Sequence, residues 1–465
     1  MLALKKIIPV VIFSLIFLTC CAYGLEKPRI IVTTDGEKDD RCSFVRYLLY
    51  TNHFDTEGIV YVNSKHHKHG EGTEWVQNFI RSYGEVYENL LLHDDQYPHP
   101  EKLLSVVKIG NLWDQNMHGV GPDKDTAGSD HIVSVILKDD PRPVWVLCWG
   151  GMNTVAQALY RIKVSHPDKL AMINKKVYIH AIAGQEDSAD GQSSYDYVGS
   201  EFPEIFYIQE WQYMVISYDH RRDHKYGNAC IFSELWLSSN VKTNHGPLGA
   251  HYARKKVNEG DSPSFIYLIP TGLRSTENPG YGGWGGRYRK VENFGYDSFW
   301  PKADPLNLDM LAKPSHGSNN FWTDDYDDGD RLKPIWRWII AIANDFQARM
   351  DWCVNDYTNA NHQPVVKLGH SVDLTVQSGD SVKLSAEGTI DPDDDRLFFE
   401  WWQYREPGTY EGYVVIENAS SEEAFFIAPI VDSVKRLHLI LEVTDNGIPN
   451  LTRYQRIIVT VKPHE

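Results

Sequence analysis

The sequence predicts an α/β domain built on an open, mostly parallel sheet, followed by an all-β immunoglobulin-like sandwich. Over residues 28–356, short continuous apolar runs alternate with longer amphipathic stretches, as expected where helices cover both faces of a parallel sheet. Beyond residue 364 the apolar runs become short and alternating, and turn residues separate them. With 42% hydrophobic and 23% charged residues, the composition is that of a folded globular chain.

The first 24 residues are interpreted as a signal peptide. Two lysines precede an apolar run over residues 7–18, and small residues end at Gly24, where we expect cleavage. The mature chain is then periplasmic or extracellular. Cys20 and Cys21 leave lipoprotein processing as an alternative, although the residues around them fit that signal imperfectly. The apolar run is shorter than the ~20 residues of an ordinary membrane span, so no span is expected.

Four apolar runs in the first region are continuous enough to be buried parallel strands. They cover residues 29–34, 58–62, 144–148 and 177–182. Amphipathic segments of helical length lie between them, at residues 73–87 and 152–165, and a closing helix is expected at 335–354. Residues 25–356 are therefore predicted to form one α/β domain.

A polar segment, residues 355–364, is expected to link this domain to a β-sandwich over residues 365–465. Alternating runs predict strands at residues 381–386, 397–402, 437–443 and 455–461. Acidic turns near Asp391 and Asp445 resemble those of polycystic-kidney-disease-like and cadherin-like immunoglobulin folds. Calcium binding there is one interpretation, and a solvated acidic turn is the commoner one.

Charge and motif content exclude several classes of function. Lys and Arg number 46 against 63 Asp and Glu, a net charge of −17, which argues against a nucleic-acid partner. The four cysteines that would remain after cleavage are widely spaced, so neither a disulfide-dense scaffold nor a zinc site is indicated. No Gly-x-Ser-x-Gly, Walker or His-Glu-x-x-His motif supports a serine esterase, a nucleotide triphosphatase or a zincin.

The strongest chemical pattern is a group of aspartates after the first predicted strand, at Asp35, Asp39 and Asp40. In open α/β sheets ligands bind beyond the carboxyl ends of the strands, so these side chains are expected in the site. Carboxylates this close repel one another unless a hard cation such as Ca²⁺ shares their oxygens. Capping of the following helix is the alternative, because acidic residues stabilise a helix N-terminus. The residues alone leave both open.

The spacing of these aspartates resembles the Asp-Thr-Asp-Pro-Gly-x-Asp-Asp signature of nucleoside hydrolases, with Thr33 in place of the first acid. Residues 58–63, 148–154 and 259–265 resemble, in the same order, that family's second strand, Gly-x-Leu-Thr-Asn turn and His-Asp-Pro segment. Residues 117–119 are similar to a His-Gly loop near its pocket.

Residues 282–288 and 344–352 resemble one branch of that family, the secreted nucleoside hydrolase-like proteins described as cellulose-binding, which carry a C-terminal β-sandwich. The resemblance implies an open sheet of nucleoside hydrolase type. It also implies that Ca²⁺ is held by the carboxylates of Asp35, Asp40 and Asp261 and by the main-chain carbonyl of Trp149. Asp35 and Asp39 would be catalytic, with Asp35 as the base. The further substrate contacts expected are Asp39, Asn63, His118, Asn153, Glu186, Asp187 and Trp284.

Two departures bear on the substrate. Gly260 stands where the family commonly has a histidine that assists the leaving base, and residues 183–187 stand where a Glu-Phe-Asn ribose motif would lie. Glu186, Asp187 or Glu259 would then protonate the leaving group, or the leaving group is not a nucleobase.

The chain is therefore interpreted as an exported, calcium-dependent hydrolase of N- or O-glycosidic bonds in a small furanoside or a sugar derived from plant polysaccharide. The alternative is a non-catalytic cellulose- or polysaccharide-binding protein. Two further patterns stay open. The histidine- and lysine-rich loop at residues 65–69 could line the pocket, bind a transition metal or be solvated. Trp284, Trp322 and Tyr288 could stack on sugars or fill the core.

Overall fold

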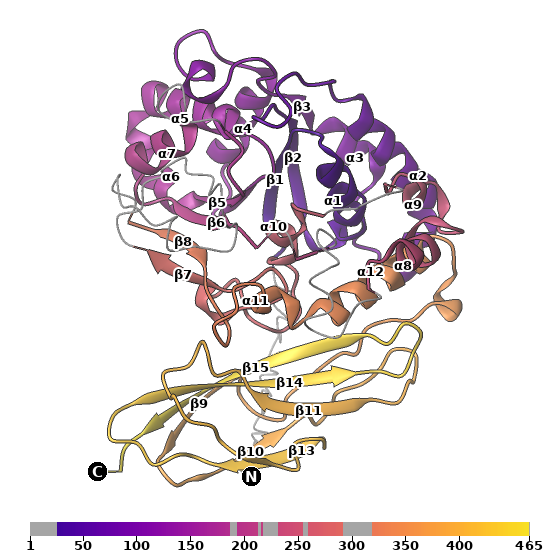
Figure 1. The fold of residues 1–465 in the computed structure, drawn as a ribbon, viewed down its shortest axis with the longest axis vertical. Helices are drawn as coiled ribbons and strands as arrows, with labels where there is room; N and C mark the ends of the chain where they lie inside the picture. The colour runs from indigo at the N-terminus through magenta and orange to yellow at the C-terminus, as the bar shows by residue number, and fades with distance from the viewer. Residues whose placement is uncertain are drawn as a thin grey trace, which may run out of the picture.

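The computed structural model describes residues 26–186, 193–212, 215–216, 231–253, 259–291 and 319–464. Figure 1 shows an α/β domain packed on a two-layered β domain, with β14 and β15 next to α11 and α12. The predicted signal peptide lies outside the described residues. No helix within the described part of the chain combines the length and the apolar character needed to cross a membrane.

The α/β domain contains an eight-stranded sheet in the order β3-β2-β1-β4-β5-β6-β8-β7, in which only β7 runs antiparallel to its neighbour. This confirms the predicted open, mostly parallel sheet. The strands are β1 (Arg29–Thr34), β2 (Asp55–Tyr61), β3 (Val107–Ile109), β4 (Val144–Cys148), β5 (Val177–Ile182), β6 (Phe206–Glu210), β7 (Tyr288–Val291) and β8 (Phe321–Asp324). The strand order reverses between β1 and β4. In such sheets ligands bind at the carboxyl ends of the two strands that flank the reversal.

Helices cover both faces of the sheet (Figure 1). They are α1 (Lys38–Leu49), α2 (Glu74–His93), α3 (Pro100–Ser105), α4 (Ala127–Leu137), α5 (Asn153–Ser165), α6 (Leu170–Lys176), α7 (Ser194–Glu201), α8 (Glu234–Leu237), α9 (Gly246–Ala250), α10 (Ser262–Ile266), α11 (Lys333–Trp336) and α12 (Ile339–Trp352). Shorter turns are η1 (Thr51–His53), η2 (Asn116–Gly119), η3 (Pro167–Lys169), η5 (Ser238–Lys242), η6 (Pro279–Tyr281) and η8 (Tyr357–Asn359). The single closing helix expected at residues 335–354 is thus two helices.

The middle of β1, residues 30–32, is apolar without interruption. Ile30 and Val32 belong to the hydrophobic cluster on one face of the sheet, whereas Ile31 belongs to the cluster on the other. Because successive side chains of a strand point to opposite faces, both faces of β1 are buried here. The polar residues at the two ends of the strand are buried as well.

The C-terminal region forms two β-sheets, ordered β11-β14-β15-β9 and β10-β13-β12. Their strands are β9 (Asp373–Gln377), β10 (Ser381–Ser385), β11 (Phe398–Gln403), β12 (Ile416–Glu417), β13 (Glu423–Ile427), β14 (Lys435–Thr444) and β15 (Thr452–Lys462). The predicted runs correspond to β10, β11, β14 and β15. On β14, Leu439 and Leu441 face the sandwich core, while Ile440 between them joins the core of the α/β domain. Strand β14 is therefore buried on both faces.

Main-chain hydrogen bonds join the two domains. The N–H groups of Tyr454 and Arg456 on β15 donate to the carbonyl oxygens of Thr271 (3.0 Å) and Gly272 (3.0 Å). The Arg456 guanidinium also donates to the carbonyl oxygens of Leu273 (2.7 Å) and Gly282 (2.9 Å). Gly272 has a φ of +92°, and a Cβ there would clash with the Tyr454 carbonyl. The two domains are thus fixed by a ladder that only glycine permits.

Hydrogen bonds to the main chain and to the interdomain linker hold the two acidic turns of the sandwich. One oxygen of Asp391 accepts from the N–H groups of Asp393 (2.9 Å) and Asp395 (3.1 Å). One oxygen of Asp445 accepts from the Leu451 N–H (2.9 Å) and from the linker residue Asn361 (3.1 Å). Asp445 is buried, so its turn is not the solvated acidic turn expected from the sequence.

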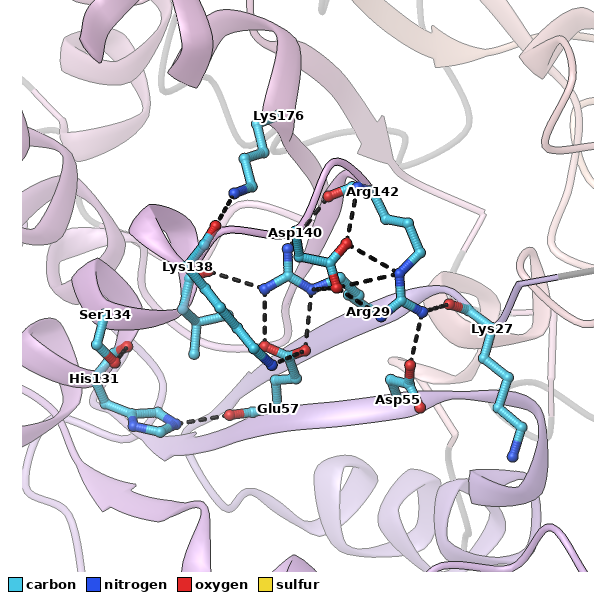
Figure 2. A network of polar contacts seen from close by, with 11 residues as sticks. Lys27, Arg29, Asp55, Glu57, His131, Ser134, Lys138, Asp140, Arg142 and Lys176 are labelled. Carbon is cyan, nitrogen blue, oxygen red and sulfur yellow. Dashed lines mark hydrogen bonds and ion pairs between the residues drawn. The ribbon is translucent and has the colours of Figure 1, made fainter. Parts of the chain in front are cut away.

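A charged network ties together the amino ends of the central strands (Figure 2). The buried Arg29 guanidinium, at the start of β1, donates to both carboxylate oxygens of Glu57 on β2 (3.0 and 2.9 Å). Arg142, just before β4, donates to Asp140 (2.7 Å) and to Asp55 (2.7 Å). These contacts fix the register of β1, β2 and β4 at the end of the sheet opposite the carboxyl ends.

Candidate active site

Carboxylates from two distant segments meet beyond the carboxyl end of β1. Asp39 and Asp40 lie in the first turn of α1, and Asp261 immediately precedes α10. One potential ligand oxygen from each lies within 4.8 Å of the others. Asp40 is 2% exposed and Asp261 is 1% exposed. The structure thus brings together the segments on which the sequence interpretation depended.

Asp35 is a fourth buried acid at this place. One of its oxygens accepts from the Glu37 N–H (3.0 Å), and the other has no hydrogen-bond partner. One oxygen of Asp261 is also without a partner. A buried carboxylate oxygen without a donor is costly unless a cation or a proton satisfies it. The close trio includes Asp39 where the sequence interpretation had Asp35.

The acids raise one another's pKa. Burial, followed by the nearby charge of Asp35, raises the pKa of Asp39 to about 6. Burial and the neighbouring carboxylates raise the pKa values of Asp40 and Asp261 well above the usual range. Glu37, at the rim, has a pKa raised to about 7 by burial and by Asp35 and Asp39. The group therefore cannot ionise fully at neutral pH without a counter-charge, which suits a divalent cation.

Asp40 also shapes the turn between β1 and α1. One of its oxygens accepts from the Thr34 hydroxyl and from the N–H groups of Asp35 (3.1 Å) and Gly36 (3.4 Å). These donors precede the helix, and the N-cap residue Glu37 makes no side-chain capping bond. Asp40 therefore holds the turn before the helix rather than forming an N-cap hydrogen bond, although Asp39 and Asp40 do lie at the positive end of α1, as the alternative interpretation expected.

The end of β4 packs directly against the acids. A Cβ at Gly150 would lie 3.0 Å from the Asp35 Cβ, so the peptide after Trp149 passes close to that carboxylate. The Trp149 indole donates to the Ser264 hydroxyl (2.8 Å), which donates to the Asp261 carbonyl (2.6 Å). Trp149 thereby connects β4 to the segment that carries Asp261.

Gly260 is the point of closest approach to Asp39. A Cβ at Gly260 would lie 2.7 Å from an Asp39 carboxylate oxygen. A larger side chain at this position would displace Asp39.

Two predicted contact residues, Asn63 and Asn153, lie together beside this site. The Asn153 amide donates to the Asn63 side-chain oxygen (3.1 Å), and both amides donate to the Asp114 carbonyl (2.6 and 2.8 Å). The Asn63 carbonyl accepts from the Gly151 N–H (2.8 Å). These bonds lock the carboxyl end of β2 to the start of α5.

Both described acids that were expected to protonate a leaving group are engaged elsewhere. The two oxygens of Glu186 accept from the N–H groups of Met152 (3.0 Å) and Ser194 (2.8 Å), which ties the starts of α5 and α7. Glu259 forms a fully buried ion pair with Arg46 and accepts from the Tyr252 and Ser262 hydroxyls. Both are structural in this arrangement. Asp187 lies outside the described residues.

The expectation that Trp284 stacks on a sugar is wrong, because its ring is only 1% exposed. It packs under the Arg453 guanidinium (5.4 Å) and against the edge of Tyr454 (6.5 Å), both from the sandwich. Tyr288 is likewise buried, and its hydroxyl donates to Glu210. His118 is exposed on η2.

Two further residues border the site: His67, in the loop whose role the sequence left open, and Trp113, to which the sequence assigned no role. The His67 ring contacts the Asp35 carbonyl through Nδ1 (2.7 Å), so the loop at residues 65–69 lies beside the acids. None of its histidines belongs to the metal-capable trio of the described residues. Trp113 is 69% exposed on the neighbouring loop. In the sequence, the position of each loop directly after a strand was the indication that its residues would lie near the site.

Two family models match the chain. The model described as "Cellulose-binding Sde182, nucleoside hydrolase-like domain" matches residues 29–288, which include the whole carboxylate cluster. The chain belongs to this family of nucleoside hydrolase-like proteins. The model described as "Cellulose-binding protein Sde0182, C-terminal domain" matches residues 381–461. No curated protein matches the chain.

Among solved structures, the chain is similar to a nucleoside hydrolase-related hypothetical protein from Saccharophagus degradans that is associated with carbohydrate metabolism. The identity is 33%, the match covers 94% of this chain and 100% of that one, and the TM-score is 0.79. A PKD domain from KIAA 1837 protein matches at 25% identity over 22% of this chain and 87% of that one, with a TM-score of 0.16. The type III effector XopQ, complexed with adenosine diphosphate ribose, matches at 11% identity over 71% and 95%, with a TM-score of 0.33. The last two matches support no argument about function.

Proposed function

We propose that the chain is an exported, calcium-dependent hydrolase of N- or O-glycosidic bonds, acting on a small furanoside or a sugar derived from plant polysaccharide. One observation carries the proposal: Asp39, Asp40 and Asp261 converge at the strand-order reversal, with unpartnered buried oxygens on Asp261 and on the adjacent Asp35.

The donor set fits calcium. Asp39, Asp40, Asp261 and Asp35, together with the Trp149 carbonyl, would hold the ion, since Ca²⁺ takes several hard oxygen ligands and tolerates irregular geometry. When bound, the ion would supply charge that orients neighbouring sugar hydroxyls and acidifies a nearby water.

The chain's own groups supply the remaining chemistry. Asp35 would accept the proton of the attacking water, because one of its oxygens is buried and has no donor. Asp39 would orient sugar hydroxyls, and the buried Asn63–Asn153 pair would hold the adjoining turn in place. The surrounding carboxylates favour the positive charge that develops on the sugar ring in an oxocarbenium-like transition state.

A turnover screen tests this function. Nucleosides, aryl furanosides and plant oligosaccharides are incubated with the full chain, with Ca²⁺ or with EDTA. We expect hydrolysis of a glycoside that EDTA abolishes and added Ca²⁺ restores. The variant Asp35→Asn should lose turnover, whereas the matched control Asp139→Asn, at the other end of the sheet, should not. Hydrolysis that is indifferent to EDTA would overturn the proposal.

A second function is a non-catalytic polysaccharide-binding protein. The family description as cellulose-binding favours it, as does the structural engagement of Glu186 and Glu259. A cellulose or pectin pull-down that persists in EDTA and in Asp35→Asn, with no turnover of any substrate, would establish this function instead.

A further inference from the structure

Trp113 is an aromatic side chain that the fold leaves in water. Its ring is 69% exposed, in the loop between β3 and η2. Single exposed apolar residues are common, so exposure alone assigns no role. What sets Trp113 apart is how firmly its backbone is held and what lies on either side of it.

The turn that carries Trp113 is fixed by the buried Asn111. The Asn111 side-chain oxygen accepts from the N–H groups of Trp113 (3.0 Å) and Asp114 (3.0 Å). The Asn111 N–H donates to the Thr154 hydroxyl (2.9 Å), and its carbonyl accepts from the Asn63 N–H (3.0 Å). The indole is therefore presented from a rigid turn attached to β2 and α5, and stacking on it costs little backbone entropy.

Contacts on both sides of Trp113 connect this turn to the candidate active site. The Asp114 carbonyl, one residue after Trp113, accepts from Asn63 and Asn153. On its other side the Trp113 ring lies 5.5 Å from the His69 ring, with an interplanar angle of 38°. His69 belongs to the loop whose His67 contacts the Asp35 carbonyl. Trp113 thus stands at the rim where the two loops meet.

We propose that Trp113, with His69 beside it, is a stacking platform for a sugar ring of a carbohydrate chain whose neighbouring sugar occupies the carboxylate site. The inference rests on the proposed function and narrows its substrate class to oligosaccharides. The flat apolar face of a sugar ring packs on an indole, and a platform open to solvent lets the chain continue outward. The buried Asn63–Asn153 pair holds the Asp114 carbonyl and so attaches the platform to the strand ends beside the acids.

Calorimetric titration of the full chain with oligosaccharides of increasing length tests the platform. It is carried out in the Asp35→Asn background to prevent turnover. Adding Trp113→Ala should weaken oligosaccharide binding by about tenfold, whereas Trp113→Phe should retain most of it. Tyr413→Ala, a matched loss of an aromatic that is 70% exposed on the sandwich, should change nothing. Unchanged melting temperatures confirm that the variants are folded.

Three results would overturn the platform: oligosaccharide affinity equal with and without Trp113, no oligosaccharide binding by the parent chain, or weakened binding of nucleosides alone. The last would assign the ring to a nucleobase. The test separates this inference from the proposed hydrolase. If Trp113→Ala loses oligosaccharide binding and the parent chain turns over no substrate in the screen, the platform is supported and the hydrolase is refuted. Calcium-dependent turnover with chain binding unaffected by Trp113→Ala would do the reverse.

Discussion

Buried carboxylate oxygens without hydrogen-bond donors are the main feature of the candidate site. Asp35 and Asp261 each bury one such oxygen, and Asp39 and Asp40 add charge beside them. In the metal-free protein, burial and the charge of neighbouring carboxylates raise the pKa values of Asp39, Asp40 and Asp261. A bound cation would remove this penalty. The same residues would then couple calcium affinity, pH and stability.

The first prediction concerns pH. The pKa is about 6 for Asp39 and about 7 for Glu37 in the folded chain, whereas such groups ionise near ~4 when unfolded. Folded-state values raised in this way give stability that is present at low pH and lost as the pH rises through them. Calcium, which needs the ionised forms, offsets that loss. The gain in melting temperature on adding Ca²⁺ over EDTA should be small at pH 5 and large at pH 8. An equal gain at both would contradict this account.

The second prediction concerns Gly260. In Gly260→Ala the new methyl group would meet an Asp39 oxygen 2.7 Å away and push that carboxylate aside. Because overpacking costs about 1–3 kcal/mol, calcium affinity should fall by about tenfold or more. The control Gly84→Ala, whose new methyl would lie 3.2 Å from a Pro100 side chain, should bind Ca²⁺ like the parent in the same titration. Equal affinity in Gly260→Ala would show that Asp39 is not a ligand.

Among the elements, those with both faces buried were predictable and those shaped by distant partners were not. The bounds of β1, β4 and β5 match the predicted runs, because the middle of a strand covered on both faces is apolar. The predicted closing helix gives no periodic indication of its break at Trp338, which precedes α12. β6 ends in the polar residues Gln209 and Glu210, which are buried, and it was not predicted.

The site shows the same division. Asp35, Asp39, Asp40 and Asp261 could be chosen from spacing and resemblance, since a strand end and a motif fix their place. The roles of Glu186 and Trp284 could not. Partners contributed by α5, α7 and the sandwich determine their environment, and no local pattern reveals these partners. Exposure of Trp113 and burial of Trp284 likewise depend on tertiary contacts.

The third prediction concerns the network in Figure 2. Replacing the buried Arg29 by methionine removes the bidentate partner of Glu57, which is partly buried and keeps its contact with Lys138 (3.2 Å), so the free energy of unfolding should fall by about 1–3 kcal/mol. Urea denaturation of Arg29→Met should show a loss of this size. Calcium affinity should stay unchanged, because the network lies at the amino ends of the strands. A variant that keeps full stability but loses calcium would refute the assignment.

At the scale of the whole molecule, the sandwich packs against the α/β domain and is not joined to it by the linker alone. Its strand β14 is covered on both faces, and Trp338 packs against Trp402, Tyr404 and Tyr454 across the boundary. Arg453 adds a 2.7 Å ion pair with Asp345 on α12. We therefore expect the two domains to unfold together.

The fourth prediction tests this coupling. Scanning calorimetry of the parent chain should show one cooperative transition. Gly272→Ala introduces a methyl group against the Tyr454 carbonyl and strains a φ of +92°, so the ladder between the domains should break. The variant should melt in two steps, while calcium affinity is retained. Two transitions already present in the parent chain would contradict the picture of a jointly folded molecule.

The most direct test of the whole account is a calorimetric calcium titration of Asp261→Asn beside the parent chain. Asp261 is remote in sequence from Asp39 and Asp40, and only the fold brings it to them. We predict that the variant loses the calcium bound at this site, while its melting temperature in EDTA is equal to or above that of the parent, because one repelling charge has been removed. Calcium affinity in Asp261→Asn equal to that of the parent chain would contradict the account.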